Sequence, residues 1–264
     1  MKTHTILVTL MVLFLWVVFA DATESPSVDE IIDQANKVVY YSGDDGRAKV
    51  KMTIIDAQGR TREREFTILR HDVADGGEQH FYVYFKKPSD VRKMAFLVHK
   101  HIDRDDDRWL YLPALDLVKR IAASDKRTSF VGSHFFYEDV SGRGIDEDSH
   151  EIVEETDTHF VIKNTPKDPD SVEFASYTVW IDKNTYMPTK AEYVDPSGNT
   201  YRNVEALEIK DIQGFPTVTK SRVRDLASGG ETISEFTDIE YNIGLEDQIF
   251  TERYLRKPPR EVRQ

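Results

Sequence analysis

The sequence contains no cysteine among its 264 residues. A chain without cysteine forms no disulfide, so its stability must come from core burial and hydrogen bonding even in an oxidising compartment. Positive charge is also scarce, because 47 Asp and Glu residues outnumber 35 Lys and Arg residues and give a formal net charge of −12. This acidic balance argues against general nucleic-acid binding and against adhesion to anionic lipid headgroups through charge alone.

Catalytic signatures are missing as well. The sequence has no G-x-S-x-G elbow, no P-loop, no H-E-x-x-H motif and no cysteine nucleophile. The best metal candidate is His99 with His101, which would share one face of a strand, followed by Asp103. A polar strand end before an acidic turn is the commoner interpretation of this pattern. We therefore expect no enzyme activity, no cofactor and no bound metal.

Long hydrophobic runs are absent apart from one at the N-terminus, residues 6–20. This run is short for a membrane span, follows Lys2 and precedes the A-x-A sequence of residues 20–22, as in a secretory signal. We predict a cleaved signal peptide over residues 1–22 and one domain over residues 23–264, located outside the cytoplasm. No cysteine follows the run, so the chain is not itself a lipoprotein; an uncleaved anchor is the alternative interpretation.

One helix is predicted near the start of the mature chain. Ser27 and Glu30 form an S-x-x-E capping box with Pro26 before it. The apolar residues that follow at helical spacing form one stripe, so this helix is expected to lie on another part of the protein. The stripe consists of Val28, Ile31, Ile32, Ala35, Val38 and Val39.

The rest of the chain is predicted to be mostly strands joined by short turns, which favours an antiparallel meander and argues against a βαβ arrangement. The expected strands cover residues 48–54, 62–69, 80–86, 94–101, 108–112, 117–122, 151–155, 159–164, 175–182, 189–194, 201–212, 217–225 and 231–242. Residues 124–144, here called the aromatic segment, are the exception, because they are glycine-punctuated and not strand-periodic. They could form a short helix or a lid. The basic tail, residues 256–264, is expected to be frayed.

Several expected strands are apolar on both faces. In residues 80–86, for example, Phe81, Val83 and Phe85 alternate with Tyr82 and Tyr84. In a sheet with one solvent-exposed face, apolar and polar residues alternate along each strand. These strands are apolar on both faces, so each face must be covered by another part of the protein or by a ligand. The pattern fits an ordinary sandwich core, or a curved sheet around an apolar cavity with helices as its lid.

Four segments resemble the outer-membrane lipoprotein-sorting family, the LolA/LolB-like periplasmic carriers. They are residues 80–88 (HFYVYFKKP), 107–113 (DRWLYLP), 119–122 (KRIA) and 129–139 (SFVGSHFFYED). The resemblance implies a mainly β fold, a half-open antiparallel β-barrel formed by a strongly curved sheet, with a few helices packed in or over its mouth. It also implies an apolar cavity and a lid, and it assigns to them Phe81, Val83, Phe85, Lys87, Phe96, Val98, Trp109, Tyr111, Phe130, Phe135, Phe136 and Tyr137.

Lys87 is a departure from the family. LolA has an arginine at the corresponding position before a proline, and that arginine holds the lid through hydrogen bonds. Lysine lacks the planar fork of arginine, so the same latch is not expected here.

The function that the resemblance implies is a periplasmic carrier that binds acyl chains of lipoproteins or lipids and shuttles them toward the outer membrane. Its partners would be the acylated cargo, an inner-membrane transporter as donor and an outer-membrane acceptor, with the protein itself a monomer that binds no nucleic acid. Two other functions remain open from the sequence: a lipid-sensing module without a transport role, and a secreted metal-dependent enzyme built around His99, His101 and Asp103.

Overall fold

The structure, a computed structural model, describes residues 25–263. Within this range, 13 strands form one sheet in the order β6-β5-β4-β3-β2-β1-β13-β12-β11-β10-β9-β8-β7, and each neighbouring pair is antiparallel. The strands are β1 Asp45–Ile55, β2 Thr61–Asp72, β3 Gln79–Lys87, β4 Ala95–Lys100, β5 Asp107–Leu112, β6 Leu117–Ile121, β7 Asp148–Glu155, β8 His159–Pro166, β9 Ser176–Asp182, β10 Pro188–Val194, β11 Thr200–Ile212, β12 Phe215–Asp225 and β13 Gly230–Tyr241.

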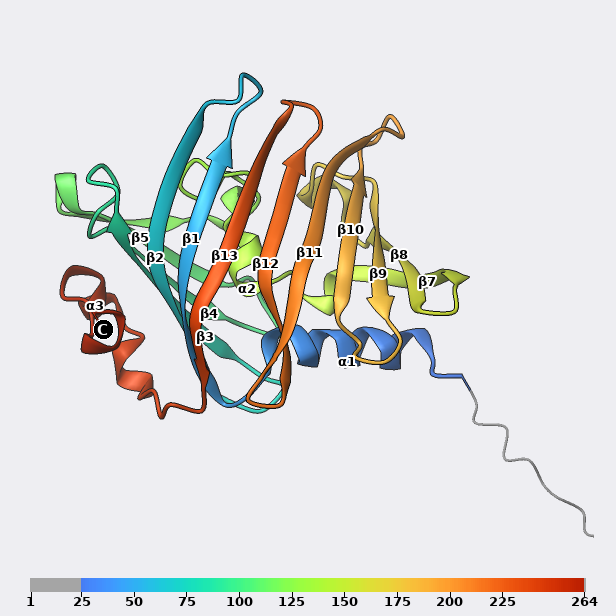
Figure 1. The fold of residues 1–264 in the computed structure, drawn as a ribbon, viewed down its shortest axis with the longest axis horizontal. Coiled ribbons are helices and arrows are strands. Elements are labelled where there is room, and N and C mark those ends of the chain that lie inside the picture. Colours follow the sequence, from blue (N-terminus) through green and yellow to red (C-terminus); the bar gives the residue numbers. More distant parts are fainter. Residues whose placement is uncertain (1–24, 264) are drawn as a thin grey trace, which may run out of the picture.

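The sheet is strongly curled but does not close. Strands β1 and β11 to β13 form the front wall in Figure 1, and β3 to β5 turn behind them. Strands β6 and β7 are the two edges, and they do not pair with each other among the described residues. The expected half-open antiparallel barrel is therefore confirmed, and each expected strand range overlaps an observed strand.

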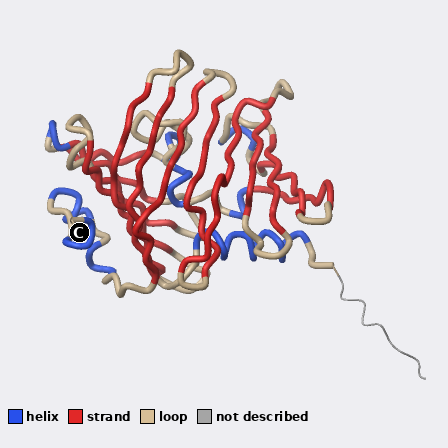
Figure 2. Tube along the Cα trace, viewed as in Figure 1, coloured by secondary structure: helices blue, strands red, loops and turns tan. Residues whose placement is uncertain are grey.

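Helices are few and short, as Figure 2 shows. They are α1 Val28–Tyr40, α2 Glu138–Ser141 and α3 Glu252–Arg256, with 3-10 turns at Pro113–Leu115, Ala123–Asp125, Ile145–Glu147, Pro169–Ser171, Asp247–Ile249 and Arg260–Val262. The predicted capping box begins α1, since the Glu30 N–H donates to Ser27 Oγ and the Ser27 N–H donates to Glu30 Oε2. The buried stripe of this helix, with Ile31 and Ala35 at its centre, packs against β8 and β9.

Strands β2 to β5 are covered on both faces by the chain itself. Their inner face packs against the aromatic segment, which lies within the curl of the sheet (Figure 1). Their outer face packs against residues 245–263, here called the C-terminal segment, which includes α3. The expectation of a frayed tail is wrong for residues 256–263, because Val262 is fully buried against this outer face and Pro259 is buried as well.

The predicted signal peptide, residues 1–22, lies outside the described residues. In the part of the chain that the structure describes, no helix has the length and apolar character needed to cross a membrane.

Candidate functional site

An apolar cavity of about 320 Å³ lies between the curled sheet, the end of α1 and the aromatic segment. This volume falls at the lower end of the range of ligand pockets. The sheet contributes inward-facing residues from five strands, among them Met52 of β1, Ile68 of β2 and Phe236 of β13. Ser234 also lines the cavity, and its buried hydroxyl has no hydrogen-bond partner. The walls offer hydrocarbon contact with few polar groups, which suits an apolar ligand.

The aromatic segment closes one side of this cavity through a tight local turn. The Phe130 N–H donates to the Phe135 carbonyl at 2.7 Å, and Val131 and Gly132 adopt left-handed backbone angles between them. This turn places the Phe130 ring at the centre of an aromatic cluster. Its centroid lies 5.4 Å from Phe96 and 5.8 Å from Phe85, distances typical of favourable aromatic pairs.

Eight of the twelve expected site residues gather around this cavity. Four of them line it directly: Phe81, Val83, Phe130 and Phe135. The other four belong to the same buried cluster without lining the cavity: Phe85, Phe96, Val98 and Tyr137. The structure therefore brings together the residues of β3, β4 and the aromatic segment that the resemblance grouped.

Trp109 and Tyr111 are placed elsewhere, and their expected position near the cavity is wrong. Along β5 they alternate with Arg108 and Leu110, and it is the latter pair that faces inward. Trp109 and Tyr111 instead pack with the cluster under the C-terminal segment. Because successive side chains point to opposite faces of a strand, one apolar strand contributes to both covers.

Lys87, which the resemblance assigned to the cavity and lid, does not lie at the cavity either. Its side chain is exposed, and its ammonium pairs with Glu65 at 2.9 Å, so it lines no part of the cavity.

Phe136 lies against cations rather than in the cavity. The guanidinium carbons of Arg127 and Arg202 lie 4.9 and 4.4 Å from its ring centroid, which are cation–π distances. Arg127 also stacks on Phe174 and Tyr193. This stack joins the aromatic segment to β10 and β11, so Phe136 helps to hold the aromatic segment against these two strands.

Two other cations hold the covers of the cavity through backbone carbonyls. Lys100 of β4 donates from Nζ to the carbonyls of Ser141 at 2.6 Å and Gly142 at 3.3 Å, at the end of α2. Arg70 of β2 donates to the carbonyls of Tyr40, Ser42 and Gly43, at the end of α1. No sequence motif marked these residues, because their partners are backbone groups distant in the sequence.

A buried charge network anchors the aromatic segment to the rest of the protein. Glu138 of α2 pairs with Arg127 at 2.5 Å and with Lys126 at 3.4 Å, and Arg127 also binds Glu173 at 2.7 Å. Burial acts to raise the pKa of Glu138, but the neighbouring Arg127 and Lys126 cations outweigh it, so this pKa lies below its ordinary value. Glu138 therefore stays ionised at neutral pH, and the network remains intact.

The metal candidate is not assembled. His99 Nε2 bonds the carbonyl of Phe250 at 2.7 Å, whereas His101 bonds Glu78 at 2.8 Å and Asp107 at 3.1 Å. Asp103 is exposed. Among residues 25–263, no group of three or more metal-ligating side chains is placed to hold an ion.

Comparisons with known proteins agree with this geometry. A family model described as "Uncharacterized protein" matches residues 77–257. The chain belongs to this family. No curated protein matches it significantly.

Solved structures with the same fold include one that is named for lipoprotein sorting. A DUF1329 family protein from Desulfovibrio piger is 27% identical, with a TM-score of 0.78 over 86% of this chain and 98% of its own. A putative outer membrane lipoprotein-sorting protein domain from Vibrio parahaemolyticus is 29% identical, with a TM-score of 0.78 over 86% and 97%. A LolA superfamily protein from Nitrosomonas europaea is 20% identical, with a TM-score of 0.67 over 87% and 100%. The resemblance to the lipoprotein-sorting family is thus confirmed, and the fold is that of a LolA-like open barrel.

Proposed function

We propose that this protein is a periplasmic carrier that binds an acyl chain of a lipoprotein or lipid in the apolar cavity and shuttles it toward the outer membrane. The observation that carries the proposal is the cavity itself, an apolar space of about 320 Å³ inside the fold of the lipoprotein-sorting proteins. Exposing an acyl chain to water costs about 0.8 kcal/mol per CH₂ group, so a carrier must enclose most of the chain.

Release needs a cover that can move, and the aromatic segment has the features of such a lid. Lys100 holds the end of α2 through backbone carbonyls, and the network of Glu138 and Arg127 holds its start. Breaking these contacts would separate Phe130 and Phe135 from the sheet and widen the cavity. Carriage of this kind needs no covalent step, which agrees with the missing catalytic motifs.

The partners follow from the direction of transport. An inner-membrane transporter would donate the acylated cargo, and an outer-membrane acceptor would offer the chain a more favourable site. A monomer exported by a cleaved signal peptide over residues 1–22 fits this route, with residues 23–264 as one domain.

Filling the cavity tests the proposal. Ser234 lies on the cavity wall of β13, whereas Thr237 lies on the same strand and is exposed. We expect Ser234→Phe to lower the affinity for a fluorescent fatty acid at least tenfold, and Thr237→Phe to leave it unchanged. Native mass spectrometry of the purified protein should show lipid bound to the wild type and to the Thr237 variant only.

Two outcomes count against the carrier. If folded wild-type protein binds no fatty acid or lipopeptide at micromolar concentration, the proposal fails. If both phenylalanine variants bind equally well, the ligand site is not this cavity. Transfer of bound lipopeptide to acceptor vesicles separates a carrier from a lipid sensor, because a sensor has no need to deliver its ligand.

A further inference from the structure

A second pocket lies beside the apolar cavity and is polar. It has a volume of about 500 Å³ and lies between the end of α1, the turn from β4 to β5 and the end of the aromatic segment. Two of its lining residues, Lys100 and Arg108, are long cations that are 7% and 2% exposed. Residues of these types are almost never so deeply buried without a partner that neutralises them.

The two cations are close and share one counter-ion. Arg108 pairs with Val98 across the sheet, two residues before Lys100, so both cations lie on the inner face as diagonal neighbours. Arg108 donates from Nη2 to Asp106 at 2.6 Å, but its Nε and Nη1 have no hydrogen-bond partner. Lys100 bonds two backbone carbonyls and, among the described residues, forms no ion pair with a carboxylate.

This arrangement leaves Lys100 without a carboxylate of its own and leaves two donors of Arg108 unused in a buried place. Burial lowers the pKa of Lys100 from its ordinary value, and the charge of Arg108 acts in the same direction, against Asp106, Glu147 and Glu138. Buried donors without partners are costly, so this part of the pocket is poised to accept an anion. The other carboxylates that line the pocket are exposed or already paired: Asp103, Asp105, Asp146 and Asp168 are exposed, Glu147 pairs with Lys126 and Arg143 at 2.7 Å, and Asp33 pairs with Lys37.

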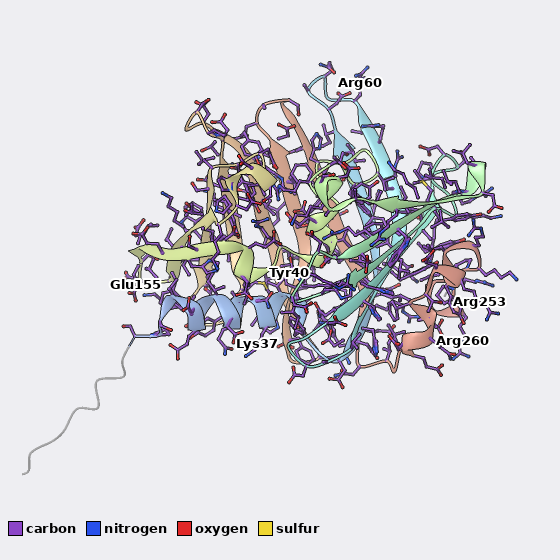
Figure 3. The ribbon with its side chains drawn as sticks, turned by 180° about the vertical axis from the view of Figure 1, so that it is seen from behind. Lys37, Tyr40, Arg60, Glu155, Arg253 and Arg260 are labelled. Carbon is purple, nitrogen blue, oxygen red and sulfur yellow. The ribbon has the colours of Figure 1, made fainter. Side chains whose placement is uncertain are left out.

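One side chain separates the polar pocket from the apolar cavity. Tyr40 lines the cavity, and the Nζ of Lys100 lies 5.1 Å from its ring centroid. Gly142 lines the polar pocket and lies so close to the ring that a Cβ there would lie 2.4 Å from Tyr40 Cζ. Tyr40 lies where α1 reaches the middle of the molecule, as Figure 3 shows. A ligand with an apolar part and an anionic part would therefore find both environments next to each other.

We propose that Lys100 and Arg108 form a subsite for the anionic headgroup, a phosphate or a carboxylate, of the amphiphile whose hydrocarbon chain occupies the apolar cavity, with Tyr40 between the two parts. This inference rests on the proposed function and deepens it, because it names the class of cargo as an anionic amphiphile. The overall acidic charge of the protein does not oppose it, since binding depends on two buried cations rather than on the outer surface.

The test compares two lipids that share a tetradecanoyl chain and differ in headgroup: a lysophosphatidate and a neutral monoacylglycerol. We expect the wild type to bind the lysophosphatidate about tenfold more tightly, the effect of one or two charge-assisted hydrogen bonds. Lys100→Gln removes the charge and keeps an N–H donor for the Ser141 carbonyl, and it should reduce this ratio to about twofold or less. Lys87→Gln removes an exposed cation outside the pocket and should leave the ratio unchanged.

The outcomes separate this inference from the proposed function. Equal binding of the two lipids by the wild type overturns the headgroup subsite and leaves the acyl carrier intact, whereas binding of neither lipid overturns the carrier itself. An unchanged ratio in folded Lys100→Gln rejects Lys100 as the headgroup ligand. Inorganic phosphate that binds as tightly as the lysophosphatidate would show a free-anion site and not a lipid site.

A competition experiment covers the case in which Lys100→Gln does not fold. Rising inorganic phosphate should then weaken binding of the lysophosphatidate to the wild type and leave binding of the monoacylglycerol unchanged. If phosphate weakens the binding of both lipids equally, or weakens the binding of neither lipid, the proposed headgroup subsite is contradicted.

Discussion

The two covers of strands β2 to β5 differ in what they enclose, although both meet an apolar sheet face. The C-terminal segment covers the outer face with buried side chains such as Phe250, Leu255 and Val262. The aromatic segment covers the inner face with Phe130 and borders a cavity of about 320 Å³. An apolar face is thus not by itself a sign of a binding site; what matters is whether its cover fills the space above it.

The covers also differ in how they are attached. The outer cover is held by close packing and by a row of histidines, His71, His80 and His99, which pair across β2, β3 and β4 beneath Phe250. The inner cover is held by buried ion pairs and by cations that bind backbone carbonyls. Both covers contain packed side chains and hydrogen bonds to backbone carbonyls, but the buried ion pairs of Glu138 belong to the inner cover. Ion pairs can be exchanged for water when a segment moves, so we propose that the inner cover is the one that moves.

The largest expected effect comes from truncating one phenylalanine in each cover. Phe250 is 0% and Phe130 is 2% exposed, so they form a matched pair. Phe250→Ala should lower the free energy of unfolding by about 3–5 kcal/mol, because it leaves a new void in a packed region. Phe130→Ala should lower the free energy of unfolding by less, because it enlarges a cavity that already exists. Of the two variants, only Phe130→Ala should change the lipid affinity. Urea unfolding measures the loss of stability, and fatty-acid titration measures the lipid affinity. If Phe250→Ala and Phe130→Ala change the lipid affinity equally, the inner cover is not the one that borders the ligand site.

Breaking the ion-pair network should have the next largest effect. Arg127→Met leaves the buried Glu138 and the exposed Glu173 without their shared partner, which should cost about 3 kcal/mol of stability through Glu138 and speed lipid dissociation. Arg120→Met is the control, since Arg120 pairs with Asp107 at the exposed edge and should cost less than about 1 kcal/mol. Stopped-flow dissociation of a fluorescent lipid should distinguish them; similar rates in both variants would exclude the network from lid closure.

A smaller effect is expected at the contact between Tyr40 and α2. Gly142 has a φ of 77° and no room for a side chain, whereas Gly214 has a φ of 88° and nothing within 4 Å of the point that a Cβ would occupy. Both alanine variants carry the backbone strain of about 1 kcal/mol, but only Gly142→Ala should also displace Tyr40 and accelerate lipid entry. Lipid association rates that are equal in the two variants would mean that Tyr40 does not limit access.

The smallest effect should appear on mild acidification. Burial lowers the pKa of His80, the charge of His99 acts in the same direction, and Asp247 partly opposes both. The unfolded chain then binds more protons than the folded one, so this contribution to stability is complete above about pH 6.5 and is lost as the pH falls through the lower folded value. The contribution of Glu138, whose pKa is also lowered, persists until the pH falls below about 4.3.

Between pH 7 and pH 5, therefore, the outer cover should loosen while α2 stays in place. Hydrogen exchange should rise in residues 245–263, and around His134, whose pKa is also lowered by burial, and remain unchanged in residues 138–144. The opposite order would show that the histidine row does not hold the C-terminal segment.

The sequence by itself determined the strands, the first helix and the mainly β class of the fold. Period-two alternation marked the strands, as in residues 48–54, and the S-x-x-E pattern at Ser27 marked the start of α1, because both signals arise from neighbours along the chain. It also showed that strands such as β3 need two covers. These are local properties, and local pattern is enough to predict them.

Only the tertiary structure decided that the aromatic segment, and not the C-terminal segment, borders the cavity, and which contacts hold the aromatic segment there. Trp109 and Tyr111 look equivalent to the inward residues in composition, but the register of β5 turns them to the outer face. The basic tail was expected to be frayed, yet Val262 finds an apolar face contributed by β2 to β4. Arg202 and Asp139 pair across 63 positions of sequence. Such contacts depend on how the sheet curls and which distant groups it brings within a few ångströms, and no pattern along one segment records that.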